Sequence, residues 1–434
     1  EIFIRTYGRV ERKADRLPKT VTAGKTPKAK KDEEGVQEYL LVDGYNVIFA
    51  WDELKELADT AGAKTVGRVI QNRESVHPGT YLGKGKLEEL KELLYDLDAT
   101  GVICDDELSP AQLNNLEQEL ECKVMDRTMV ILDIFAQRAK TSEGKIQVEL
   151  AQLKYRAARL VGMRASLSRL GGGIGTRGPG EKKLEMDRRL IHSRIGQLKE
   201  QLEQVQKHRE LIRSQRDKSQ VKVAAIVGYT NAGKSTLLNT MTQAGVLEED
   251  QLFATLDPTT RALDLPGKQQ ILLTDTVGFI RKLPHHLIEA FKSTLEEAKY
   301  ADMILHVVDA SNPQMDEHMQ VVYDTLRQLG VSDKKMITLF NKQDLCTDKE
   351  QLRDFQADHV LQISAKNGQG LEKLKELLAD VLREGQIYIE RLVPYDQAGS
   401  IARIRKYGQV VQEEFLAEGI SVKAYVPMEV YSQI

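Results

Sequence analysis

The chain has 434 residues, 41% of them hydrophobic, and this length predicts roughly two to four domains with cores of their own. Its formal net charge of −3 argues against a protein that binds nucleic acid over its whole surface. Its three cysteines are odd in number and lack a C-x-x-C spacing, which argues against a disulfide framework or a zinc site.

No apolar run approaches the roughly 18 residues that a membrane helix needs, and we recognise no signal peptide, so a cytoplasmic protein without a membrane span is expected. Residues 1–38 are polar and charged, which favours disorder. Residues 39–58 predict a strand, a turn and a helix, and resemble the start of an NYN/PIN-like ribonuclease domain, in which an aspartate at the position of Asp43 helps hold a metal. The other carboxylates of that chemistry do not follow. We therefore expect residues 1–56 to be an extension with an incomplete NYN-like fragment and no nuclease activity.

Residues 57–137 alternate between strand and helix patterns, which predicts a small α/β domain with a parallel sheet. Ser109 followed by Pro110 is a typical helix start. The expected strands are 65–70, 101–104 and 122–125, and the expected helices are 85–97 and 109–120.

A helical hairpin is predicted for residues 138–218. One long helix should run from about Thr128 to Val161, with a break near Gly144, and a second carries apolar residues at spacings of three, four and seven from Leu184 to Ile212. The glycine-rich stretch 171–180 between them is expected at the exposed tip.

This hairpin carries a charge opposite to the rest of the chain. Residues 154–218 contain 17 basic and 7 acidic residues, a net charge of +10, so the remainder carries −13. A basic arm with a glycine-rich tip suits irregular RNA, although a solvated coiled coil that packs on the domain following it in the chain is the alternative. The candidate RNA-binding residues are Arg164, Arg169, Arg177, Gly172, Gly173 and Gly175.

Residues 228–235 (G-Y-T-N-A-G-K-S) have the spacing of a phosphate-binding loop and follow the apolar strand pattern 223–227. The loop amides and the start of the next helix favour phosphate, Lys234 would reach the outer phosphates, and Ser235 would ligate Mg²⁺.

Three further motifs follow strand-like runs and identify the nucleotide as GTP. The carboxylate in N-K-Q-D at 341–344 can accept two N–H bonds from guanine, and S-A-K at 364–366 would close over the base. D-T-V-G at 275–278 fits the turn that senses Mg²⁺ and the γ-phosphate.

The predicted fold class is α/β: a P-loop GTPase domain at 219–386 with a mostly parallel sheet, preceded by the small α/β domain and the hairpin. A small α+β domain at 387–434, with strands near 388–394 and 420–426 around a helix, completes the chain.

Long motifs at 172–181, 184–189, 228–235, 253–261 and 275–280 resemble the HflX family of ribosome-associated GTPases, from about residue 57 to residue 434. The resemblance implies a monomer that binds the rRNA and proteins of the large ribosomal subunit. There it would split or rescue stalled or idle ribosomes, and GTP hydrolysis would drive release. A ribosome-assembly GTPase and a GTP-switched regulator that recruits a protein are the alternatives.

In the family pattern Thr255 joins Ser235 on Mg²⁺, with Thr259 and Thr260 as nearby alternatives. Phe279 stands where Ras-like enzymes place a glutamine that orients water, so we expect slow hydrolysis that ribosomes stimulate. Lys234, Thr255 and Gly278 are the predicted catalytic residues. The predicted GTP site comprises Gly228, Tyr229, Thr230, Asn231, Ala232, Gly233, Lys234, Ser235, Phe253, Ala254, Thr255, Leu256, Asp257, Asp275, Thr276, Val277, Gly278, Asn341, Lys342, Asp344, Ser364, Ala365 and Lys366.

Overall fold

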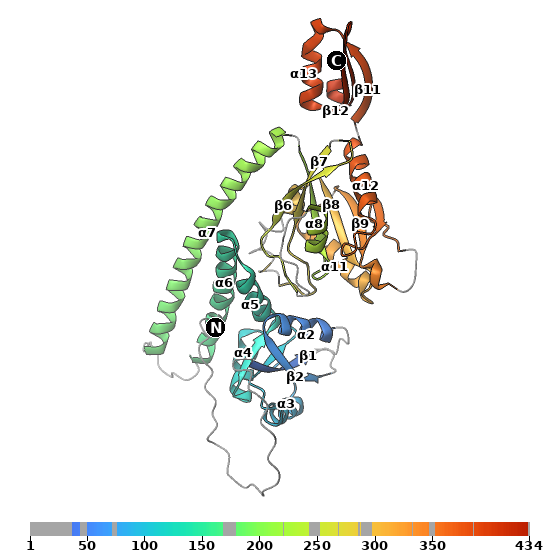
Figure 1. Cartoon of the computed structure of the whole chain (residues 1–434). Helices are drawn as coiled ribbons and strands as arrows, with labels where there is room; N and C mark the ends of the chain where they lie inside the picture. Colours follow the sequence, from blue (N-terminus) through green and yellow to red (C-terminus); the bar gives the residue numbers. More distant parts are fainter. Residues whose placement is uncertain are drawn as a thin grey trace, which may run out of the picture. The chain divides into compact units, whose positions relative to one another are not determined.

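The computed structural model describes residues 37–43, 50–71, 76–167, 179–219, 221–242, 252–267, 269–284, 287, 297–331, 333–346, 352–384 and 386–432 (Figure 1). The chain divides into two compact units. The first contains Glu1–Glu203 and Lys282–Ala290, and the second contains Gln204–Arg281 and Phe291–Ile434.

The first unit is built on a parallel sheet of four strands in the order β2-β1-β3-β4. Its strands are β1 (Gln37–Asp43), β2 (Ala63–Ile70), β3 (Gly101–Cys104) and β4 (Lys123–Asp126), and its flanking helices are α2 (Ala50–Thr60), α3 (Lys84–Asp96) and α4 (Pro110–Leu120). Leu40, Val102 and Val124 of this sheet lie in one core with Leu90 of α3. Ser109 caps α4 in a capping box with Gln112, as its sequence predicts.

The position of β1 corrects the predicted boundary at residue 56. β1 pairs with both β2 and β3, and Leu40 and Val42 are fully buried, so this strand is central to the sheet. The segment read as an extension with an NYN-like fragment therefore contributes β1 and α2 to the first α/β domain. The short run of sequence could not show this, because the strands that flank β1 lie further along the chain.

Three longer helices follow the sheet: α5 (Arg127–Arg138), α6 (Ser142–Leu167) and α7 (Pro179–Ser219). The predicted break near Gly144 lies a few residues earlier, between α5 and α6. Thr141 explains its position, because the hydroxyl of Thr141 accepts a hydrogen bond from the amide of Gly144 at 2.9 Å and so caps the start of α6.

Three apolar residues of the seam predicted along α7 are more buried than the residues between them. Ile191 and Ile195 are half-buried, Leu198 is fully buried, and the residues between them are exposed. The guanidinium of Arg194 makes two hydrogen bonds to the carboxylate of Glu149 on α6. The glycine-rich stretch, with Arg169, Gly172, Gly173, Gly175 and Arg177, and the side chain of Arg164 lie outside the described residues.

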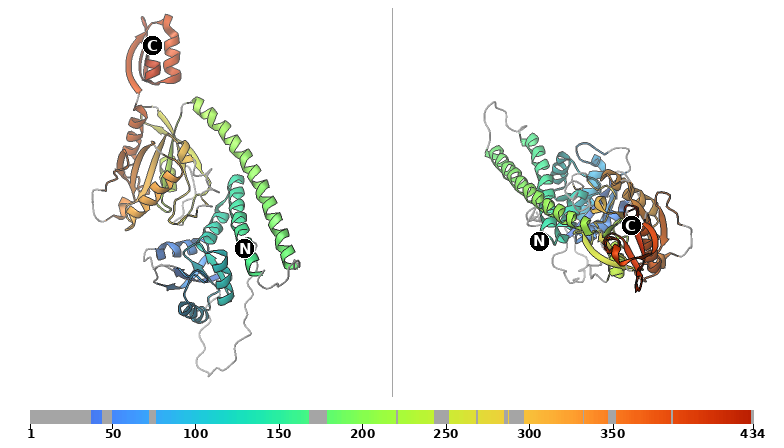
Figure 2. Two further views of the ribbon diagram at one scale, coloured as in Figure 1. Left: turned by 180° about the vertical axis from the view of Figure 1, so that it is seen from behind. Right: turned by 90° about the horizontal axis from the view of Figure 1, so that it is seen from above.

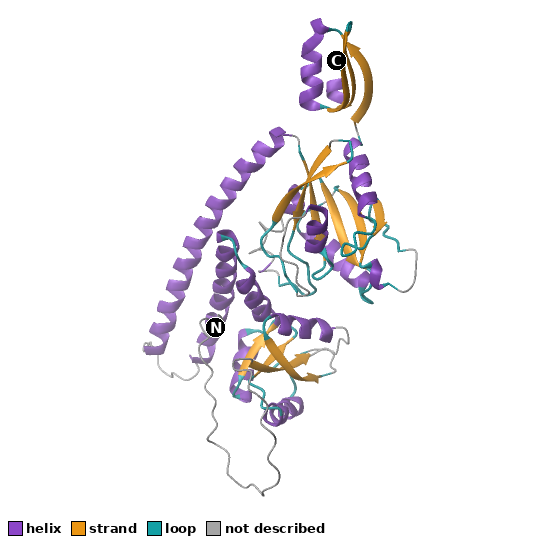
Figure 3. Cartoon of the chain, in the orientation of Figure 1, coloured by secondary structure: helices purple, strands orange, loops and turns teal. Residues whose placement is uncertain are grey.

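The second unit contains a six-stranded sheet in the order β10-β9-β8-β5-β7-β6, parallel except for β6 (Figure 3). Its strands are β5 (Lys222–Gly228), β6 (Thr259–Leu265), β7 (Gln269–Asp275), β8 (Met303–Asp309), β9 (Lys335–Asn341) and β10 (His359–Gln362), and its main helices are α8 (Lys234–Thr242), α11 (Met315–Gln328) and α12 (Leu371–Arg383). The mostly parallel sheet predicted from the sequence is confirmed, and four of its strands, β5, β7, β9 and β10, end at or just before the predicted motifs.

A small α+β domain ends the chain. The antiparallel sheet β11-β13-β12 comprises β11 (Gln386–Val393), β12 (Gln409–Leu416) and β13 (Gly419–Pro427), and its helices are α13 (Ala398–Tyr407) and α14 (Met428–Tyr431). Helix α13 covers one face of this sheet (Figure 2). The sequence reading missed β12, whose outer residues Val411 and Phe415 are exposed and give it no clear apolar alternation. Among the described residues no helix has the length and apolar character to cross a membrane.

Candidate functional site

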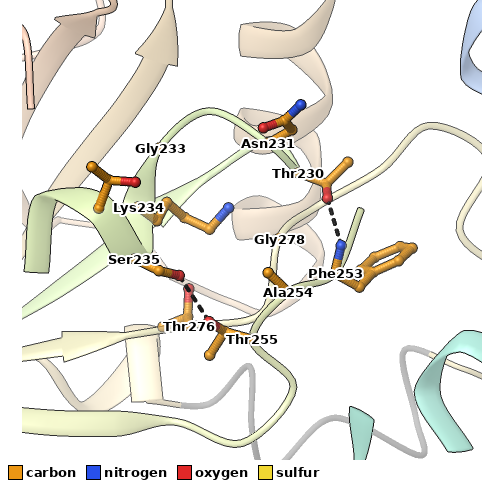
Figure 4. Close-up of a pocket in the computed structure, with 11 residues that line it drawn as sticks. Thr230, Asn231, Gly233, Lys234, Ser235, Phe253, Ala254, Thr255, Thr276 and Gly278 are labelled. Carbon is orange, nitrogen blue, oxygen red and sulfur yellow. Dashed lines mark hydrogen bonds between the residues drawn. The ribbon is translucent and has the colours of Figure 1, made fainter. Parts of the chain in front are cut away.

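The phosphate-binding loop connects β5 to α8, as the motif spacing predicts (Figure 4). Gly233 in this loop has φ 93°, and a Cβ there would lie 2.3 Å from Nδ2 of Asn341. Only glycine fits both this conformation and this close approach. The loop can therefore turn its backbone amides inward at the start of α8, where a helix N-terminus favours anions.

Lys234 begins α8 and lies almost fully buried. Its ammonium donates a hydrogen bond to the carbonyl oxygen of Tyr229 at 2.8 Å, so it points across the mouth of the loop. Burial lowers the pKa of Lys234 to about 8, although the carboxylate of Asp275 acts in the opposite direction. A buried ammonium is well suited to pair with an incoming phosphate.

Three oxygen-bearing side chains from different segments converge next to the loop. The hydroxyl of Ser235 lies 2.8 Å from the hydroxyl of Thr255 and donates to Oδ2 of Asp275 at 2.7 Å. Asp275 is fully buried, and its other oxygen, Oδ1, has no hydrogen-bond partner among the described residues. Burial raises the pKa of Asp275. The positive charge of Lys234 and the hydrogen bond from Ser235 act against this rise. Hard oxygen donors grouped in this way fit Mg²⁺.

The structure distinguishes among the three candidate threonines by position. Thr255 is the one beside Ser235, whereas Thr259 and Thr260 lie in β6. The hydroxyl of Thr260 instead meets that of Thr274 on β7 at 2.9 Å.

One cavity brings most of the phosphate-side residues together (Figure 4). The segment around Phe253 is attached to the loop, because the Phe253 amide donates to the hydroxyl of Thr230 at 2.9 Å. The cavity also includes Thr236, which the sequence reading omitted, although its hydroxyl in the first turn of α8 could have indicated it. The lining residues are Thr230, Asn231, Gly233, Lys234, Ser235, Thr236, Phe253, Ala254, Thr255, Thr276 and Gly278.

The base-side motifs are joined to the same loop. Asn341 donates to the carbonyl of Ala232 and accepts from the amide of Ala365, both at 2.9 Å. The hydroxyl of Ser364 donates to Oδ1 of Asp344 at 2.6 Å, and this bond holds the pKa of the Asp344 carboxyl below its ordinary value. Asp344 is thus a charged acceptor, oriented by the S-A-K turn, as guanine recognition requires.

The sequence was compared with known proteins. Residues 50–136 match the family model of a GTP-binding GTPase N-terminal region, 138–216 that of a GTP-binding GTPase middle region, and 223–342 that of a 50S ribosome-binding GTPase. A GTPase HflX of Lacrimispora saccharolytica is 70% identical over 383 residues, which cover 88% of this chain and 90% of the relative. The chain belongs to the HflX family of GTPases.

Other similar proteins are more distant. The GTPase HflX of Escherichia coli is 43% identical over 382 residues, covering 87% of this chain and 89% of the relative. A solved structure of a GTP-binding protein from Sulfolobus solfataricus in complex with GDP covers 80% of this chain and 98% of its own, with 26% identity and a TM-score of 0.43. The predicted HflX resemblance is confirmed, and as an HflX protein this chain is a GTPase with GTP as its substrate.

Proposed function

We propose that this GTPase binds the large ribosomal subunit in its GTP form, splits or rescues stalled or idle ribosomes, and leaves after hydrolysis. The match of residues 223–342 to a 50S ribosome-binding GTPase family carries this proposal. A bound nucleotide could control such a cycle, because the γ-phosphate and its metal order the switch segments and hydrolysis releases them.

The nucleotide site would hold Mg²⁺ through Ser235 and Thr255. Their hydroxyls lie 2.8 Å apart beside the buried carboxylate of Asp275, and Mg²⁺ would neutralise charge on the phosphates. Lys234 would bind the outer phosphates and the amide of Gly278 would meet the γ-phosphate. Thr255 lies on the switch segment, so its bond to the metal would make the order of that segment depend on the nucleotide.

Hydrolysis by the isolated protein should be slow. Phe279 cannot orient the attacking water as a glutamine would, because its side chain has no hydrogen-bonding group. We infer that the ribosome orders the switch segments or supplies a missing group. Equal turnover with and without ribosomes would contradict this.

RNA contact would come from the arm at 154–218, whose net charge of +10 suits phosphate-rich RNA. The proposed contacts are Arg164, Arg169, Arg177, Gly172, Gly173 and Gly175. Ribosomal proteins of the large subunit would complete the interface, with the protein acting as a monomer in the cytoplasm.

Sedimentation of purified ribosomes with the protein tests the proposal. We expect co-migration with the large subunit and loss of whole ribosomes with a non-hydrolysable GTP analogue, and neither with GDP. Ser235→Ala should abolish both effects. Thr325→Ala is the matched control, because that hydroxyl bonds Val321 within α11 at 2.7 Å, away from the nucleotide cavity.

The other outcomes favour the alternatives. Binding to the large subunit without splitting would favour a ribosome-assembly GTPase. Absence of binding with either nucleotide would overturn the proposal and favour a GTP-switched regulator that recruits a protein.

A further inference from the structure

A histidine of helix α11 lies against the phosphate-binding loop. Met319 and Tyr323 of this helix pack in one core with Val308 of β8, so the helix is fixed on the sheet. The ring of His318, near the start of α11, stacks on the ring of Tyr229, the second residue of the loop motif. The ring centroids are 3.7 Å apart and the ring planes differ by 5°. Neither residue is among the described residues that line the nucleotide cavity, so His318 contacts the loop from outside that cavity.

Tyr229 in turn joins the loop to the chain that follows D-T-V-G. Tyr229 is buried, and its hydroxyl accepts a hydrogen bond from the amide of Arg281 at 2.9 Å. The two backbones are paired beside it. The amide of Phe279 donates to the carbonyl of Gly228 at 3.1 Å, and the amide of Thr230 donates to the carbonyl of Phe279 at 2.7 Å. These three hydrogen bonds hold the segment against the loop, and one of them depends on where the Tyr229 ring lies.

The residue proposed to meet the γ-phosphate is next to this segment. Gly278 directly precedes Phe279, and both belong to the second unit together with Tyr229, Arg281 and His318. A turn that is already fixed loses little conformational freedom when its amide binds a phosphate, whereas a loose turn must first be ordered. Only GTP can make this contact, because GDP has no γ-phosphate. The position of the Tyr229 ring should therefore affect GTP binding more than GDP binding.

The bond between Lys234 and Tyr229 depends much less on that ring. Lys234 donates to the backbone carbonyl of Tyr229 at 2.8 Å. This carbonyl shares one planar peptide with the amide of Thr230, which is held by its own bond to Phe279. Loss of the ring stack should thus leave the Lys234 ammonium, and with it GDP binding, nearly unchanged.

We propose that His318 is a positioning residue for the GTPase site. Through its stack on Tyr229 it holds the hydroxyl that accepts from Arg281, and so keeps the turn at Gly278 in place for the γ-phosphate. This role depends on the proposed contact between the Gly278 amide and that phosphate. Helix α11, which carries none of the nucleotide motifs, thereby helps to distinguish GTP from GDP.

Affinities for GDP and for a non-hydrolysable GTP analogue, measured by calorimetric titration of full-chain variants, test this role. We expect His318→Ala to weaken binding of the analogue about threefold to tenfold, as loss of an aromatic stack would, with GDP binding unchanged within about twofold. Unchanged GDP binding also shows that the variant folds. His318→Phe keeps a flat ring on Tyr229 and should restore the affinity for the analogue to within about twofold. Gln320→Ala, which removes a surface bond to Asp324 on the same helix (2.9 Å), is the matched control.

Tyr229→Phe tests the connection between His318 and the turn. This variant keeps the ring stack and loses the hydroxyl, so it should weaken binding of the analogue relative to GDP in the same direction. Combined with His318→Ala, it should weaken binding no more than the stronger single variant does, because both changes break one connection. Fully additive losses would contradict the assignment.

Equal weakening of both nucleotides in His318→Ala, unchanged binding of both, or no recovery in His318→Phe would overturn the proposal. Gly278→Ala separates its failure from failure of the γ-phosphate contact. If Gly278→Ala weakens binding of the analogue more than binding of GDP and His318→Ala does not, the contact stands and His318 has no part in it. If neither variant does so, the contact itself is wrong.

Discussion

The side-chain amide of Asn341 donates a hydrogen bond to the carbonyl oxygen of Ala232 at 2.9 Å. The other end of that amide, Oδ1, accepts from the amide of Ala365 at 2.9 Å. Asn341 is buried, and Gly233 lies against it so closely that a Cβ would touch its Nδ2. One side chain thus joins the phosphate-binding loop to the turn expected to cover the base.

Asn341→Ala should weaken GTP and GDP binding together, about tenfold or more. The substitution leaves the carbonyl of Ala232 and the amide of Ala365 buried without their partner, at a cost of about 1–3 kcal/mol for each group. Calorimetric titration of both nucleotides measures the effect. Asn312→Ala, which loses a local bond to Gln314, is the control. A loss confined to guanine selectivity would contradict the joint role.

Asp344→Asn should change which base is bound. The carboxylate, oriented by Ser364, can accept two N–H bonds from guanine. The asparagine side chain has only one acceptor oxygen, and its NH₂ group would face the second guanine N–H, donor against donor. We expect GTP affinity to fall about 100-fold and xanthosine triphosphate to bind better, measured by competition between the two nucleotides. Ser364→Ala should cost less, about tenfold, because the charge remains. A variant that still prefers GTP would exclude this role for Asp344.

The local parts of the nucleotide site could be predicted from the sequence because the residues that form each part are neighbours along the chain. A strand, a glycine turn and a helix start are fixed by neighbouring residues, so the loop at 228–235 and the capped start of α4 are predictable. The spacing of Asp275 and Asn341 after apolar runs also placed both at strand ends.

Features that depend on distant pairing could not be predicted in this way. Tyr39 of β1 pairs with Gly101 of β3, and nothing within residues 39–58 records that partner. Lys282 and Asp105 are 177 residues apart, and neither position has a local pattern that indicates an ion pair. Tertiary packing decides such contacts, and local preference is a weak guide to them.

Nucleotide affinity should fall above about pH 8 because of Lys234. Burial lowers its pKa to about 8 in the nucleotide-free protein, and bound phosphates favour the charged form. Below that pKa the ammonium is already present. Above it, binding must take up a proton, so the dissociation constant of GDP should rise up to tenfold per pH unit. Titrations between about pH 7 and about pH 9 measure this slope. Lys234→Met should bind weakly with little slope, and an equal slope in this variant would contradict the assignment.

His306 should make the second unit less stable in mild acid. It lies in β8, at the centre of the six-stranded sheet, and neither ring nitrogen has a hydrogen-bond partner among the described residues. Its ring packs edge-to-face with the ring of Tyr323, with 5.2 Å between the ring centroids. Burial lowers the pKa of His306 from 6.5 to about 4, although the charge of Asp354 opposes the shift. The unfolded chain therefore binds the proton more readily than the folded chain. The stability contributed by neutral His306 is complete above about pH 6.5 and is lost as the pH falls toward 4.

The loss should amount to about 2 kcal/mol at about pH 5, since one pKa unit corresponds to about 1.4 kcal/mol. Urea unfolding of the second unit at about pH 7 and about pH 5 measures it, with His306→Leu as the test variant. Leucine fills the site without a titrating group, so the variant should lose less stability on acidification than the natural protein by this amount. His359→Leu, at a half-buried histidine of β10 in the same sheet, is the matched control and should retain the original difference. An equal loss in the His306 variant would assign the acid sensitivity to other groups.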